Sequence, residues 1–145
     1  MSKKLDPDIY KIAALPRDAK RLRKAGLSCL STDMAWILKN GKILNLCALT
    51  VHNNHTLEMF KMHGYQVVYT WSVTRMLKIL EYPVVEKMPK NGWQCRVSVE
   101  THDENGKFCI RHEGELGPTV AEATVNMLLR LLKENHINSK YVSKI

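Results

Sequence analysis

Hydrophobic and polar residues alternate between residues 93 and 113, and this pattern predicts two neighbouring β-strands. The apolar positions of the first strand are Trp93, Cys95, Val97 and Val99. Polar residues occupy the positions between them, as expected for a strand with one buried and one exposed face. The sequence DENG at residues 103–106 predicts a turn, after which Phe108 and Ile110 continue in a second strand. We therefore expect a hairpin over residues 93–113.

An amphipathic helix is predicted soon after the hairpin. Thr119 followed by Glu122 is the pattern of a capping box, in which side chains satisfy free N–H groups at the helix start. The apolar face of the helix comprises Val120, Ala123, Met127, Leu128, Leu131 and Leu132. Val125 and Leu129 widen this face, so we expect the helix to pack on two sides. An uncovered second side would favour a homodimer.

Capping residues and prolines predict four shorter helices earlier in the chain. Asp6 followed by Pro7 is typical of a helix start. The other three helices are expected over residues 17–25, 31–41 and 72–80. Residues 56–63 fit either a helical turn or an alternating strand, and we favour a helix there.

Two further strands are expected, over residues 42–51 and 65–69, and Asn53 with Asn54 predicts a turn between them. Together these elements predict an α+β fold: a mainly antiparallel sheet of about four strands with helices packed on it, ending in a ββα module. The expected organisation is a basic helical segment at residues 1–26, an α+β domain at 27–138 and a tail at 139–145.

The composition is that of an ordinary globular protein. The chain has 145 residues, of which 45% are hydrophobic and 25% charged. No apolar run approaches the ~18 residues of a membrane span, so we expect no membrane partner. The N-terminal residues lack the apolar stretch of a secretory signal, and we expect a cytoplasmic protein.

Positive charge is concentrated near the N-terminus. The net charge is +8, and residues 1–24 hold eight of the 22 Lys and Arg but three of the 14 acidic residues. The candidate nucleic-acid-binding residues are Lys20, Arg21, Arg23 and Lys24, whose charges can neutralise phosphates. A helix-turn-helix is disfavoured, because residues 26–30 are longer than the usual turn. Nucleic-acid binding is therefore an alternative function.

Aromatic residues supply a second set of candidates. Tyr69 and Trp71 precede a predicted helix, and Trp36 is expected on the exposed side of the helix at 31–41. Aromatic rings stack on bases or ligand rings, and they also close the edges of hydrophobic cores. Both interpretations stay open, and these three residues are the candidate ligand-binding side chains.

Catalytic and metal-binding patterns are not found. His52 and His55 are separated by a predicted turn, so we expect no metal site with His63. Glu113 and Glu115 lie near a strand end and are expected to be solvated rather than catalytic. There is no Gly-x-Ser-x-Gly sequence, and the glycines occur singly. We expect no enzyme activity and no cofactor.

The four cysteines are spread along the chain and include no Cys-x-x-Cys pair. In a reducing compartment, buried structural thiols are the favoured interpretation. Cys95 and Cys109 flank the hairpin turn, and we expect them to be cross-strand neighbours.

The order of elements in the C-terminal half resembles a family of small phage and prophage proteins of gut bacteria. It is carried by Tyr69-Thr70-Trp71-Ser72 before a helix, the strands at residues 93–101 and 108–113, and Pro118-Thr119-Val120-Ala121-Glu122-Ala123 opening the last helix. These proteins are grouped with the phage ABA-sandwich type of domain, and the likeness covers residues 27–138. The resemblance supplies no catalytic residues. It implies a non-catalytic binding protein of a phage or mobile element, which acts on a host protein or sequesters a small ligand.

Overall fold

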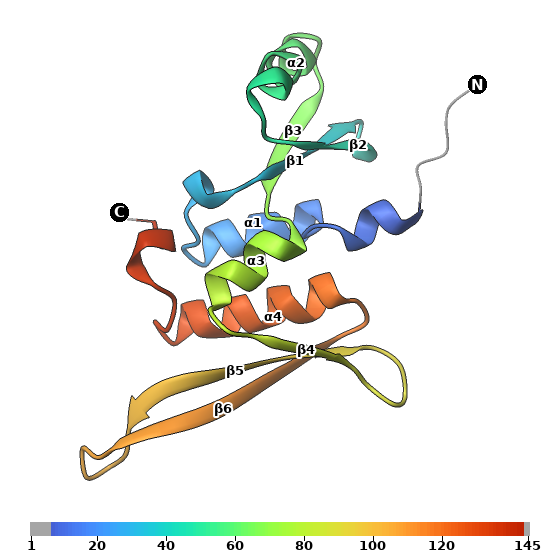
Figure 1. Ribbon diagram of the computed structural model, residues 1–145. Coiled ribbons are helices and arrows are strands. Elements are labelled where there is room, and N and C mark those ends of the chain that lie inside the picture. The colour runs from blue at the N-terminus through green and yellow to red at the C-terminus, as the bar shows by residue number, and fades with distance from the viewer. Residues whose placement is uncertain (1–6, 144–145) are drawn as a thin grey trace.

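The computed structural model describes residues 7–143, so the expected cap Asp6 lies outside the described residues. Two three-stranded antiparallel sheets lie at opposite sides of a layer of helices (Figure 1). With 39% helix and 34% strand, the predicted α+β class is confirmed. The strands are divided between two sheets, where the sequence predicted one sheet of about four.

The first sheet has the order β2-β1-β3. Its strands are β1 (Met34–Lys39), β2 (Lys42–Ala48) and β3 (Gln66–Thr70). The helix predicted over residues 31–41 is wrong, because this stretch forms β1 and its turn. Asn40 and Gly41 both have positive φ, 52° and 78°, as the two-residue turn of a hairpin requires.

Burial on both faces explains the error at β1. Trp36 and Leu38 belong to the main core, whereas Ala35 and Ile37 belong to a small second core with Leu57. A strand covered on both sides is apolar without alternation, so its pattern cannot be told from that of a short buried helix.

Helix α2 (Val51–Met62) connects β2 to β3 and contributes the buried Leu57 to the second core. It includes most of the helix favoured for residues 56–63. The turn predicted at Asn53 and Asn54 is wrong, because both residues lie in its first turn. Thr50 is the N-cap and accepts a hydrogen bond from the Asn53 N–H at 3.2 Å.

The second sheet has the order β4-β5-β6. Its strands are β4 (Val84–Lys87), β5 (Trp93–His102) and β6 (Phe108–Gly117). The predicted hairpin is confirmed as β5 and β6. Cys95 lies opposite Glu115, and Cys109 lies opposite Thr101, so the expected pairing of the two cysteines is wrong.

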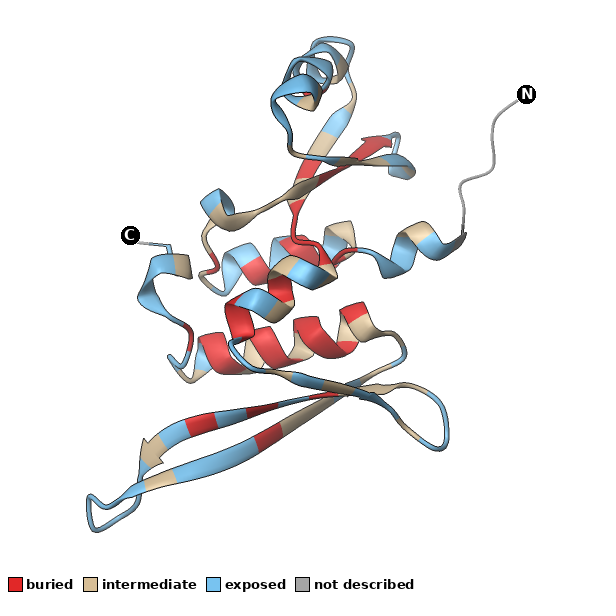
Figure 2. Ribbon diagram, viewed as in Figure 1, coloured by how far each residue is buried: buried red, intermediate tan, exposed pale blue. Residues whose placement is uncertain are grey.

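Helix α4 (Val120–Lys133) is the centre of the main core. Thr119 caps it by accepting a hydrogen bond from the Glu122 N–H at 3.1 Å. One side of α4 packs on β5 and β6; the other contacts α1 (Pro16–Lys24) and α3 (Val73–Leu80), which begins after the cap Ser72. Figure 2 shows buried residues along the whole of α4. The second apolar side, which suggested a homodimer, is therefore covered within one chain.

Both ends of the described chain join this core. Ala19 and Leu22 of α1 are fully buried in it. After α4, a 3-10 helix (Ser139–Tyr141) follows, and Tyr141 and Val142 pack against the same core. The Ser28 N–H donates to the Tyr141 carbonyl at 2.7 Å. Residues from all three predicted segments thus contribute to one body.

Candidate functional site

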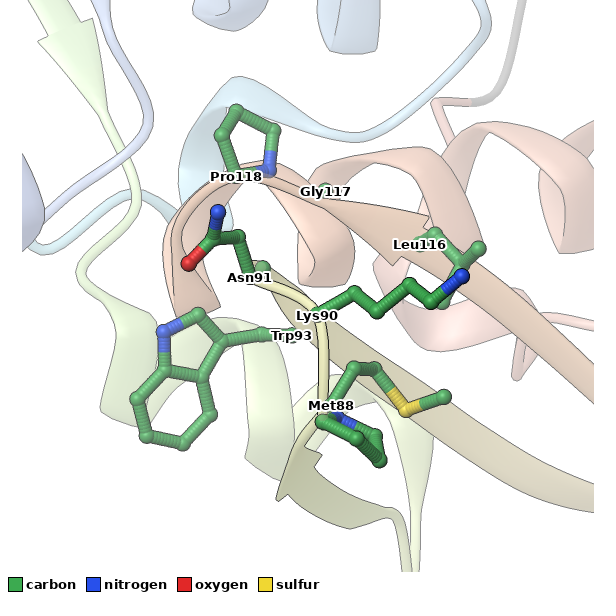
Figure 3. Close-up of a pocket in the computed structure, with 9 residues that line it drawn as sticks. Met88, Lys90, Asn91, Trp93, Leu116, Gly117 and Pro118 are labelled. Atoms are coloured by element: carbon green, nitrogen blue, oxygen red, sulfur yellow. The ribbon is translucent and has the colours of Figure 1, made fainter.

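An apolar hollow of about 730 Å³ lies at the end of the second sheet (Figure 3). It is formed by the loop between β4 and β5 and by the connection from β6 to α4. The lining residues are Met88, Pro89, Lys90, Asn91, Gly92, Trp93, Leu116, Gly117 and Pro118. Most of them are apolar; the polar side-chain groups of this lining belong to Lys90, Asn91 and the indole N–H of Trp93. Sequence patterns missed this site, because its two walls are far apart along the chain.

The loop that forms one wall is held by its backbone. Asn91 and Gly92 have φ values of 112° and 93°, and the Met88 N–H donates to the Gly92 carbonyl at 3.0 Å. Trp93 then pairs with Lys87 on one side and with Gly117 on the other. The indole is therefore attached to the central strand of the sheet.

The opposite wall depends on the close approach of β6 to α4. A Cβ atom at Gly117 would lie 2.4 Å from the Ala123 amide nitrogen, which is closer than real Cβ contacts. Glycine is therefore required where the strand passes the first turn of the helix. Figure 3 shows the Trp93 indole on one side of the hollow and Leu116, with the Lys90 side chain extended toward it, on the other.

The structure does not bring the three predicted ligand-binding residues together. Trp36 and Trp71 are fully buried, and their ring N–H groups donate to the Ala14 carbonyl at 2.7 Å and to the Ser31 hydroxyl at 2.8 Å. The expected exposure of Trp36 is wrong, because it faces the core from β1. Tyr69 packs with the second core on the opposite face of the same sheet.

The four predicted nucleic-acid-binding residues share the exposed surface of α1. Lys20, Arg23 and Lys24 line a hollow of about 410 Å³ beside the end of the helix. Arg21 is also exposed, but its guanidinium lies 3.1 Å from the carboxylate of Asp18, a residue that is 4% exposed. Asp18 thus neutralises one of the four charges, and the other three face solvent.

Glu113 is a buried charge that sequence reasoning missed. The expectation that it is solvated is wrong: Glu113 is 4% exposed and forms ion pairs with Arg111 and Arg130. Arg130 also reaches Glu115 at 3.1 Å and Glu134 at 3.4 Å. The strand register provided a signal, because Glu113 lies opposite the inward-facing Val97. The network joins β6 to the C-terminal half of α4.

The Cys95 thiol is buried, and the three candidate histidines lie on or directly after α2. Burial raises the pKa of the Cys95 thiol to about 11, with a smaller opposing effect from Thr124, so Cys95 stays protonated at neutral pH. Within residues 7–143 there is no cluster of three His, Cys, Asp or Glu side chains able to hold a metal ion. His52 and His55 are exposed on α2, and His63 follows the helix.

No protein-family model, curated protein or solved structure matches the chain. In the described part of the chain, none of the helices has the length and apolar character needed to cross a membrane.

Proposed function

We propose that this chain is a non-catalytic binding protein that takes an apolar or aromatic group of a small ligand into the hollow beside Trp93. The supporting observation is the hollow itself. Its volume of about 730 Å³ falls within the range typical of small-molecule sites, and its lining is mainly apolar. Lys90 at the rim favours a ligand that carries a negative group near its ring.

The resemblance to phage and prophage proteins extends this proposal. A small cytoplasmic protein of a mobile element would use such a site to sequester a host metabolite. If the partner is instead a host protein, one of its apolar side chains would enter the same hollow. These two forms of the proposal differ in the ligand that contacts Leu116 and Trp93: a small metabolite in the first, and a side chain of a protein in the second.

The dye anilinonaphthalene sulfonate tests the hollow, because it combines aromatic rings with one negative charge. We expect its fluorescence to rise on binding, and Leu116→Ser to weaken the affinity about tenfold through lost apolar contact. The matched control is Phe108→Ser on the same face of β6. The two side chains are similarly exposed, 58% and 55%, but Phe108 lies outside the hollow.

Equal affinity of the two variants would contradict the proposed site, as would the absence of any fluorescence change with the native protein. Thermal unfolding of both variants establishes that they remain folded, because unfolded chains also bind this dye. With the site established, a metabolite screen and a host pull-down separate the two forms of the proposal.

Nucleic-acid binding is the second candidate function, and the exposed cations of α1 favour it. We expect a short fluorescein-labelled DNA duplex to bind at low salt, with an affinity that falls as salt rises. Replacing Lys20, Arg21, Arg23 and Lys24 by glutamine should lower the slope of log affinity against log salt by about 3, because Arg21 is already paired with Asp18. The control replaces the exposed Lys42, Lys87, Lys107 and Lys133, which changes the net charge equally. If the slope fell equally in both variants, a specific nucleic-acid site on α1 would be excluded.

A further inference from the structure

Strand β5 has an open edge that the rest of the sheet leaves unpaired. β4 pairs with residues 93–96 of β5, and in the described chain no strand pairs with residues 97–102 on that side. Pairing stops where Pro83, which has no N–H group, precedes β4. Beyond Arg96, the backbone N–H and C=O groups of β5 on this side therefore have no strand partner in the described chain.

A hollow of about 490 Å³ lies along this open edge. Its lining includes Val97 and Val99 from the inner face of the sheet and Ser98 and Glu100 from the outer face. Because residues of both faces line it, the hollow surrounds the position that the next strand of the sheet would occupy. Leu80 of α3 and Leu131 of α4 extend its apolar part.

Two residues in unfavourable backbone conformations lie at this hollow. Glu81 and Tyr82 have φ values of 56° and 55°, in the left-handed region that residues with a Cβ atom rarely adopt. They connect α3 to β4, which pairs only with residues 93–96 of β5. Tyr82 is 94% exposed, so its ring is available beside the open edge. Such strain is often retained at binding sites.

The charge at the hollow indicates what would bind there. Its lining includes two acidic residues, Glu81 and Glu100, one histidine, His136, and, among the described residues, no lysine or arginine. A second copy of this chain would bring the same two carboxylates to the interface, which like-charge repulsion opposes. A strand with lysine or arginine side chains would be attracted, and its apolar residues would reach Leu80 and Leu131.

We propose that the open edge of β5 binds an extended, basic segment of another protein as an added strand. The backbone of that segment pairs with residues 97–102, as in other cases of strand addition. Its apolar side chains enter the hollow, and its basic side chains meet Glu81 and Glu100. This site shares no residue with the hollow beside Trp93, so the two proposals can fail separately.

The test uses short synthetic peptides and the amide chemical shifts of the native protein. A peptide that alternates valine and lysine should bind and shift the amides of residues 97–102. A peptide of equal charge with proline in place of valine cannot donate the same backbone hydrogen bonds, and we expect at least tenfold weaker binding. Glu100→Lys should also weaken binding of the valine peptide about tenfold, whereas Glu104→Lys in the hairpin turn should leave it unchanged.

Several results would overturn the proposal. Equal binding of the valine and proline peptides would mean charge attraction without strand addition. Equal effects of the two glutamate reversals, or shifts confined to other strands, would place the contact elsewhere. If the amide shifts of residues 97–102 changed with protein concentration in the absence of peptide, the open edge of β5 would bind a second copy of this chain instead. A peptide that causes no shift at all would also exclude the site.

Discussion

Glu113→Gln should lower the free energy of unfolding by about 2–3 kcal/mol, because it removes the negative charge from a buried site between two arginines. The Glu113 side chain is 2% exposed, and its two oxygens form ion pairs with Arg111 and Arg130. Glutamine keeps the size of the side chain but replaces one acceptor with an NH₂ group facing a guanidinium. Oε2 of Glu113 forms the ion pair with Arg130 but no hydrogen bond. We therefore expect a loss of unfolding free energy below the largest losses known for breaking a buried ion pair.

Urea unfolding of Glu113→Gln and Glu115→Gln measures the difference directly. Glu115 is on the same face of β6 and also contacts Arg130, at 3.1 Å, but its side chain is 32% exposed. An ion pair with this exposure contributes less than about 1 kcal/mol. Equal losses in the two variants would mean that burial of Glu113 does not strengthen its interactions.

Gly117→Ala should lower the free energy of unfolding by about 3 kcal/mol or more, because the new methyl group has no space. Its Cβ would lie 2.4 Å from the Ala123 nitrogen and 2.8 Å from the Glu122 carbonyl carbon. Both are backbone atoms of α4, so relief requires the helix to move away from β6. Overpacking of this kind commonly costs about 1–3 kcal/mol, and a backbone clash lies at the upper end or beyond.

Gly114→Ala is the control for this prediction, since it adds the same group to the same strand. Its Cβ would meet the Gln94 amide at 2.7 Å, and that side chain can rotate away. We expect a change below about 1 kcal/mol at Gly114. A similar small change at Gly117 would show that α4 moves easily on the sheet, and that the hollow beside Trp93 has a flexible wall.

The elements predicted best from the sequence are those in which the spacing of apolar residues follows the period of a strand or a helix. The hairpin of β5 and β6 alternates, and α4 begins at the cap Thr119, so both were found. The pattern failed at β1, where Ala35 and Trp36 are buried on opposite faces of the sheet. It also missed β4, whose four residues are too few to show a period.

The candidate sites were harder to predict, because tertiary contacts create them. The hollow beside Trp93 needs the loop at residues 88–92 to meet Leu116 across the sheet. The burial of Glu113 depends on Arg130, which reaches it from α4. The aromatic residues that stood out in the sequence, Trp36 and Trp71, are instead core side chains. Only the basic surface of α1 was accessible to prediction, because it depends on local charge alone.

The position of α4 affects how the chain folds during synthesis. The helix follows both sheets in chain order, yet α1, α3 and β5 all bury apolar side chains against it. A nascent chain that has emerged only as far as β6 therefore leaves those surfaces open to water, proteases and other chains. The main core can therefore close only after residues 120–133 have left the ribosome.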